Sequence, residues 1–196
     1  MNLEKWFPTP IWYDFLELDW GKIREHCLSI EANDTQQLKL SNIGGWHSPE
    51  LAIHDDPIFK PLFQAIQTKL NEISSQIDPR FHVNISSAWI IINRGNSHNA
   101  SHYHPESALS GVIYVSADEK SGHIAFTRGD LKQHYPINTF DSDLFNEEVT
   151  FKPEVGKLLV FPSWVYHHVN SNEGEGTRIS IAFNTRQTNK PEKSPY

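Results

Sequence analysis

Histidine is the residue type whose distribution in this sequence points to chemistry. The 196-residue chain contains 11 histidines beside a single cysteine and a single methionine. His102 and His104 lie in one short stretch, and His167 and His168 form a second cluster much further along the chain. Alternate side chains of an extended segment point to the same side, so His102 and His104 are expected to face one point, and so are His104 and Glu106.

A close pair of ligands and a distant third on a neighbouring strand would form a three-ligand metal site. His167 is the candidate for the third ligand, because two adjacent residues of a strand cannot both point inward. Three protein ligands on one side of a metal leave positions open for a chelating substrate and for oxygen, as in non-heme Fe(II) oxygenases. Without further support, surface or structural roles for these histidines would be the simpler interpretation.

Arg178 and Ser180 supply that support. They open the strand-like segment that follows the second histidine cluster, and their spacing places both side chains on one face. A buried arginine at this position would bind a dicarboxylate through paired hydrogen bonds. Taken alone, Arg178 fits better a surface charge at the end of a strand, but the joint pattern with the histidines is much more specific.

The elements that position these residues form one domain, expected over residues 1–186. The first 80 residues predict two amphipathic helices, the first capped by Asp19 and the second beginning near residue 60. From residue 82 to 186, short segments rich in β-branched residues alternate with turns. This pattern indicates an antiparallel sandwich or barrel with the helices packed on it. The segments 44–49 and 129–147 are expected to be loops that cover a substrate, and 187–196 a disordered tail.

Composition excludes several classes of function. Seventeen basic against 24 acidic residues give a net charge of −7, which argues against binding to nucleic acid. No apolar segment is long enough to span a membrane, and the N-terminus lacks the pattern of a signal peptide. The single cysteine, Cys27, favours the reducing cytoplasm. Exposed strand edges are compatible with a homodimer.

Several longer phrases of the sequence resemble a family of Fe(II)/2-oxoglutarate-dependent oxygenases. The first is His-Tyr-His-Pro-Glu-Ser-Ala-Leu-Ser-Gly-Val-Ile-Tyr-Val over residues 102–115, and the others lie at 6–12, 45–48, 161–169 and 178–184. The resemblance covers roughly residues 6–186. It implies a double-stranded β-helix, or jelly roll, with flanking helices, and an enzyme that oxidatively decarboxylates 2-oxoglutarate to succinate, most simply a hydroxylase of a small molecule or a protein side chain.

The resemblance also implies roles for individual residues. His102 and His167 would bind Fe(II), and Arg178, helped by Ser180, would bind the far carboxylate of 2-oxoglutarate. The middle ligand departs from the usual carboxylate: His104 is favoured, and Glu106 is the alternative. Further candidates for contacts with 2-oxoglutarate, or for core filling, are Tyr114, Asn93 and Trp89.

The remaining histidines, His47 among them, are interpreted as structural or surface residues. Two other functions stay open at this point. One is a cupin-like metal-dependent dioxygenase that does not use 2-oxoglutarate, which Arg178 argues against. The other is a binding domain that kept the barrel and lost turnover.

Overall fold

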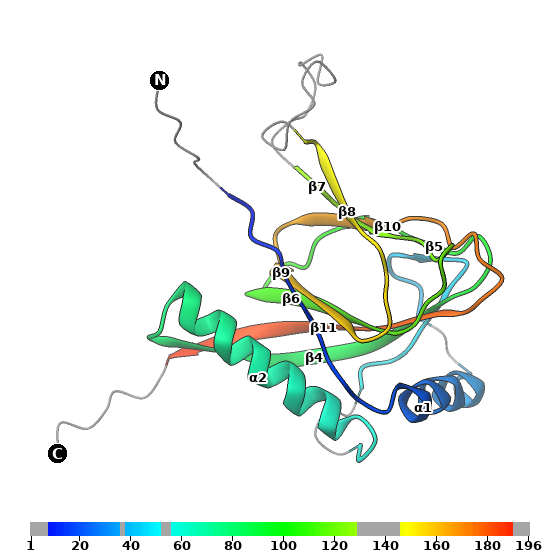
Figure 1. The fold of residues 1–196 in the computed structure, drawn as a ribbon, viewed down its shortest axis with the longest axis horizontal. Coiled ribbons are helices and arrows are strands. Elements are labelled where there is room, and N and C mark those ends of the chain that lie inside the picture. Colours follow the sequence, from blue (N-terminus) through cyan, green and yellow to red (C-terminus); the bar gives the residue numbers. More distant parts are fainter. Residues whose placement is uncertain (1–7, 36–37, 52–55, 129–145, 190–196) are drawn as a thin grey trace.

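Two antiparallel sheets and two helices make up the fold (Figure 1). A computed structural model describes residues 8–35, 38–51, 56–128 and 146–189. Along the chain the elements are β1 (Trp12–Phe15), α1 (Trp20–Asn33), β2 (Asn42–Ile43), β3 (Trp46–His47), α2 (Lys60–Ile77), β4 (Phe81–Asn93), β5 (His98–His102), β6 (Leu109–Ser116), β7 (Ile124–Thr127), β8 (Glu148–Phe151), β9 (Lys157–Pro162), β10 (Tyr166–Val169) and β11 (Arg178–Asn189).

The strand order is that of a double-stranded β-helix. One sheet has the order β1-β9-β6-β11-β4-β3 and the other the order β2-β5-β10-β7-β8. From β4 onward the chain passes from one sheet to the other at every step except between β7 and β8, which pair as neighbours in the smaller sheet. The mainly β fold with flanking helices, expected from the sequence, is confirmed.

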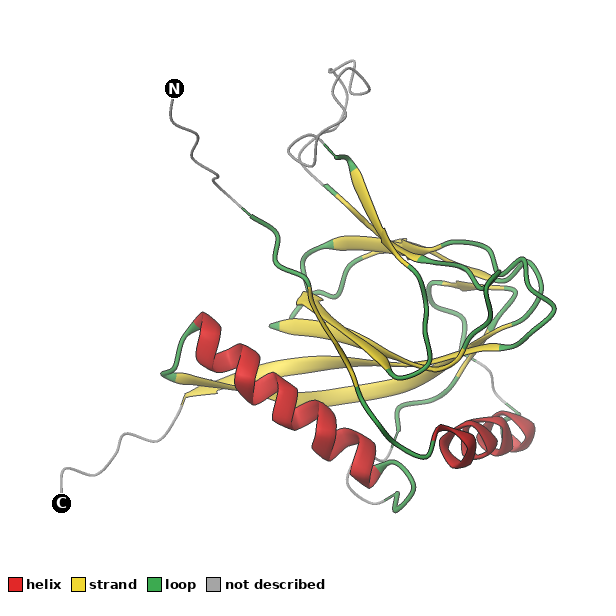
Figure 2. Cartoon of the chain, viewed as in Figure 1, coloured by secondary structure: helices red, strands yellow, loops and turns green. Residues whose placement is uncertain are grey.

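The two helices cover the outer face of the larger sheet (Figure 2). Asp19 caps α1, since its side chain accepts a hydrogen bond from the Lys22 amide at 3.0 Å. Helix α2 has a proline in its first turn, where no intrahelical donor is lost, and buries one apolar stripe. That stripe consists of Leu62, Phe63, Ile66, Leu70 and Ile73. The helices therefore brace the outer face of β4 and β11, whose inner faces remain free for a site.

A second apolar cluster, which includes Tyr114, Phe126 and Phe161, lies between the two sheets. One side of the barrel is closed by β2 and β3, because β2 pairs with β5 of one sheet and β3 with β4 of the other. The turn between them needs glycine: Gly44 has φ +75°, and a Cβ on Gly45 would collide with the side chain of Asn93. Together, β2, β3 and the turn between them hold residues 38–47 against the interior of the barrel.

Most elements lie where the sequence predicts them, with four strands missed. The two helices and the later strands agree with expectation, whereas β1, β2, β3 and β5 were not predicted as strands. The first three lie in the segment expected to be a helical layer, and β3 lies in the expected loop 44–49. Strand β11 continues to Asn189, so residues 187–189 belong to the sheet rather than to a tail. Within the described ranges, no helix is long and apolar enough to cross a bilayer.

Candidate functional site

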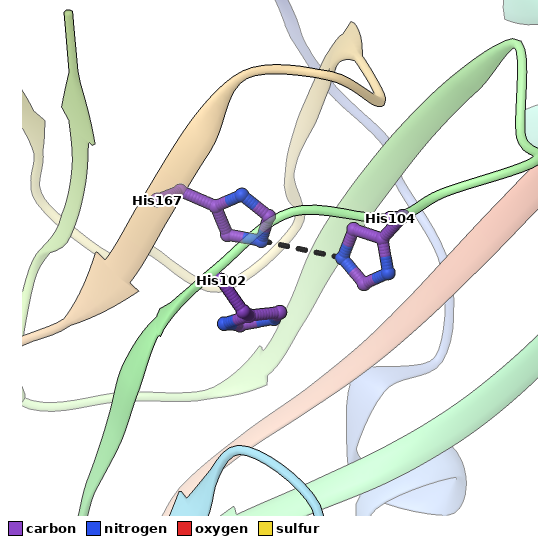
Figure 3. Close-up of side chains that lie close together, drawn as sticks. All are labelled: His102, His104 and His167. Carbon is purple, nitrogen blue, oxygen red and sulfur yellow. Dashed lines mark hydrogen bonds between the residues drawn. The ribbon is translucent and has the colours of Figure 1, made fainter. Parts of the chain in front are cut away.

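Three histidines, from two neighbouring strands and the loop after one of them, converge on one point (Figure 3). His102 ends β5, His104 follows it in the loop, and His167 lies on β10 directly opposite His102 in the antiparallel register. One ring nitrogen of each lies within 4.8 Å of the others. The pairing of β5 with β10 thus brings the two histidine clusters of the sequence together.

Hydrogen bonds to the backbone fix the orientation of two of these rings. His102 donates from Nδ1 to the Ala100 carbonyl at 2.7 Å, and His167 donates from Nδ1 to the Val165 carbonyl at 3.0 Å. Both rings therefore carry their proton on Nδ1 and present a bare Nε2 lone pair. Backbone carbonyls that hold a histidine in this way are a recurring feature of metal sites. The donor set fits a divalent iron.

The surroundings keep the histidines neutral, which is the form that binds metal. Burial lowers the pKa of His104 from 6.5 to about 4, with a further contribution from nearby His102. Burial likewise lowers the pKa of His167 from 6.5 to about 3, and the neighbouring histidines add to the effect. Burial also lowers the pKa of His102. The cluster is thus uncharged at neutral pH.

The alternative ligand and the neighbouring histidine lie away from this point. Glu106 is exposed, has φ +66°, and is not part of the cluster. His168 forms a contact of 3.1 Å with the Asn170 side chain instead of facing the interior. Among the described residues, His102, His104 and His167 lie together, and Glu106 lies outside their cluster.

The three histidines lie on the wall of a cavity of about 610 Å³, which Arg178 and Ser180 also line. Arg178 is 1% exposed, yet its Nε and Nη1 atoms have no hydrogen-bond partner among the described residues. Its guanidinium lies over the Tyr114 ring, 5.1 Å from the centroid, and the Tyr114 hydroxyl is also buried without a partner. A buried arginine with unused donors fits a carboxylate ligand, since an isolated buried charge is unfavourable.

Asn93 and Tyr114 lie behind the cavity wall rather than on it. Asn93 pairs in register with Arg178, donates to the Asn99 side chain at 3.2 Å, and leaves its own Oδ1 without a described partner. Burial raises the pKa of the Tyr114 hydroxyl, with an opposing effect of Arg178. The hydroxyl therefore stays protonated and able to donate.

His47 is the cavity residue that the sequence-based interpretation missed. It lies on β3, is 5% exposed, and lines the cavity. Its ring stacks on that of Trp89, with the ring centroids 5.8 Å apart and an angle of 8° between the ring planes. The Trp89 ring in turn packs against that of His104, with the centroids 5.7 Å apart. The signal available in the sequence was its place after a glycine pair and a tryptophan. Of the two expected covering loops, 44–49 thus contributes one lining residue, and 129–147 lies mostly outside the described residues.

Comparisons with known proteins agree with this geometry. Residues 87–184 match the model of the family described as "Putative 2OG-Fe(II) oxygenase". No curated protein matches the chain.

Solved structures of similar fold include three that cover most of the chain. A prolyl-4-hydroxylase from Pseudomonas putida is 14% identical, with a TM-score of 0.68 over 91% of this chain and 92% of that one. The α-ketoglutarate-dependent epimerase SnoN of nogalamycin biosynthesis is 12% identical, with a TM-score of 0.65 over 93% of this chain and 79% of that one. HygX from Streptomyces hygroscopicus, solved with nickel and 2-oxoglutarate, is 15% identical, with a TM-score of 0.60 over 90% and 82%. At these identities the likeness establishes the fold.

Proposed function

This chain belongs to the 2OG-Fe(II) oxygenase family, and we propose that His102, His104 and His167 hold its iron while Arg178 holds its 2-oxoglutarate. The protein is a non-heme Fe(II)- and 2-oxoglutarate-dependent dioxygenase. The observation that carries the residue assignment is a single cavity that contains both the histidine cluster and a buried arginine with unused donors.

The histidines bind the metal as neutral ligands. Because none of them brings a negative charge, the iron keeps its full double charge, unlike an iron held by two histidines and a carboxylate. That charge favours a chelating anion, and 2-oxoglutarate is one. The carbonyls of Ala100 and Val165 hold two of the rings so that their Nε2 atoms already point at the metal.

Arg178 binds the far carboxylate of 2-oxoglutarate with the two donors that no described residue uses. The Ser180 hydroxyl, which lines the same cavity, would add a hydrogen bond, and the Tyr114 ring packs against the guanidinium of Arg178. In a site shielded from water these bonds are stronger than they would be on the surface. The arginine therefore fixes the orientation of the cosubstrate.

Iron and 2-oxoglutarate, when bound, supply the oxidation of a substrate by oxygen, with succinate and carbon dioxide as by-products. The residues of this chain orient the reactants and exclude water around them. We infer that the substrate is a small molecule or an amino-acid side chain and that the oxidation is a hydroxylation, by analogy with the prolyl-4-hydroxylase named above. The single cysteine supports a cytoplasmic location.

Formation of succinate tests this function. Metal-free protein supplied with Fe(II), oxygen and 2-oxoglutarate is expected to produce succinate slowly without any added substrate, and His167→Ala is expected to abolish the product. The matched control is His168→Ala, which alters the adjacent residue that does not face the cavity. No succinate from a protein that binds both iron and 2-oxoglutarate would indicate a binding domain, and no binding of 2-oxoglutarate would indicate a different metal-dependent enzyme.

A further inference from the structure

The charges around the cavity restrict the kind of substrate that can enter. Arg178 is the single permanently charged side chain among the described residues that line it, and none of these residues is acidic. In the proposed function Arg178 is occupied by the carboxylate of 2-oxoglutarate. A cationic group of the substrate would then find no partner of opposite sign among the described lining residues, which is unfavourable.

His47 and Trp89 form a wall on one side of the histidine cluster. In the larger sheet β3 and β4 carry His47 and Trp89, while the adjacent β11 and β6 carry Arg178 and Tyr114. The cosubstrate side and the His47 side of the cavity are therefore different parts of the same sheet. Trp89 contacts His104 and is half-buried, so an apolar group beside the metal would pack against its ring.

His47 presents a hydrogen-bond acceptor on this wall. Its Nδ1 lies 2.6 Å from the Ser48 carbonyl, and because a carbonyl only accepts, Nδ1 carries the ring proton. Nε2 is then a bare acceptor, and no other described residue bonds to it. Parallel stacking on Trp89 holds the ring in place. A ring that is 5% exposed, fixed on one edge and unused on the other is suited to recognise a ligand.

We propose that His47 and Trp89 form the substrate-binding wall, and that the group oxidised belongs to a partly apolar moiety without positive charge that carries an N–H or O–H donor for His47 Nε2. An ammonium or other cationic group is disfavoured at this wall. The proposal rests on the proposed function, because it assigns the metal and Arg178 to the reaction and leaves the His47 side for the substrate.

Three probes of nearly identical shape test this proposal. Phenylacetamide is neutral with an N–H donor, phenylacetone is neutral without one, and phenylacetamidine is a cation. Binding of each is measured by saturation-transfer NMR on protein loaded with Ni(II) and saturating 2-oxoglutarate. We expect the amide to bind about 3- to 10-fold more tightly than the ketone, as for one hydrogen bond. Both are expected to bind at least about 10-fold more tightly than the cation.

Two variants assign the preference to residues. His47→Phe keeps the stacking on Trp89 but removes the acceptor, so the amide should lose its advantage over the ketone while the ketone binds as before. Trp89→Leu should weaken both neutral probes by the same factor. Binding of 2-oxoglutarate to the same samples is the check that the variants are folded.

The outcomes separate the two proposals. Tightest binding by the cation, no binding by any probe, or an unchanged ratio of amide to ketone in His47→Phe would overturn the assignment of the wall while 2-oxoglutarate still binds. Failure of the wild-type protein to bind 2-oxoglutarate would instead contradict the proposed function.

Discussion

His104 and His167 face each other with their Nε2 atoms 3.3 Å apart, although 63 positions separate them in the sequence. His167 already carries its proton on Nδ1, so without metal the bond between the two rings requires His104 to donate from Nε2. A metal ion held by both rings would replace that proton. The short contact supports the proposal that His104, and not Glu106, is the middle ligand.

Substitution of the middle residue tests this assignment. His104→Ala should weaken binding of Fe(II) by at least about tenfold, since loss even of a group that only orients a ligand has an effect of this size. Glu106→Ala should leave the affinity unchanged, because Glu106 is exposed and outside the cluster. Isothermal titration of the metal-free variants under anaerobic conditions measures both. The reverse pattern would make Glu106 the ligand.

Replacement of Arg178 by methionine should separate stability from function. The variant removes a buried charge, two of whose nitrogens have no hydrogen-bond partner in the described part of the chain, so we expect the protein without ligands to become more stable by about 1–3 kcal/mol. For a chain of this length that corresponds to a rise of about 2–12 °C in Tm. Affinity for 2-oxoglutarate should fall at least about tenfold. Calorimetry and ligand titration test the two effects, and a lower Tm would show that Arg178 is already compensated within the protein.

The stability of the metal-free protein should depend on pH through the histidine cluster. The folded protein holds His104 and His167 neutral, with pKa values of about 4 and about 3, whereas the unfolded chain takes up protons near 6.5. Below pH 6.5 the unfolded state therefore binds more protons, and the free energy of unfolding falls as the pH falls toward 4. Above about pH 7.5 these groups contribute no dependence.

Urea titrations between pH 7.5 and 5 measure this dependence. A double variant, His104→Gln with His167→Gln, serves as the control because it keeps every other titrating group. Its stability should decrease less steeply with falling pH than that of the wild type. Parallel curves for the two proteins would mean that these histidines are not held neutral by the fold.

Gly111 on β6 is expected to tolerate no side chain. A Cβ there would lie 2.7 Å from the Leu159 carbonyl and would collide with the Phe183 ring. Gly111→Ala should destabilise the protein by about 1–3 kcal/mol, as other overpacked sites do. Gly95→Ala is the control, because nothing lies within 4 Å of a Cβ at that position. Equal unfolding midpoints for the two variants in urea would refute the expected clash.

The sequence predicted those parts of the fold that have a periodic pattern. The stripe of α2 and the β-branched residues of β4 and β11 are long enough to identify their elements. The two-residue strands β2 and β3 carry no such pattern, because they form by pairing with β5 and β4 across the open side of the barrel. Their position is a property of the assembled sheets, which local propensity does not contain.

The same reasoning explains what was predicted of the site. His102, His104 and His167 were identifiable because two clusters of one metal-binding residue type stand out, and Arg178 because it lies at a fixed spacing from them. His47 was missed because a lone histidine in an expected loop gives no sign that a hairpin will carry it to the cavity. Whether His104 or Glu106 joins the other two histidines depends on the turn at Glu106, where φ is +66°. The sequence does not show that turn, so both residues were candidates.

The most direct test of the account is an anaerobic titration of the metal-free protein with Fe(II) and then 2-oxoglutarate, followed by visible absorption. The account predicts a charge-transfer band that requires both additions, is absent in His167→Ala, persists in His168→Ala, and needs far more 2-oxoglutarate in Arg178→Met. A protein that binds Fe(II) but gives no band with 2-oxoglutarate would contradict the claim that this cavity binds iron and cosubstrate together.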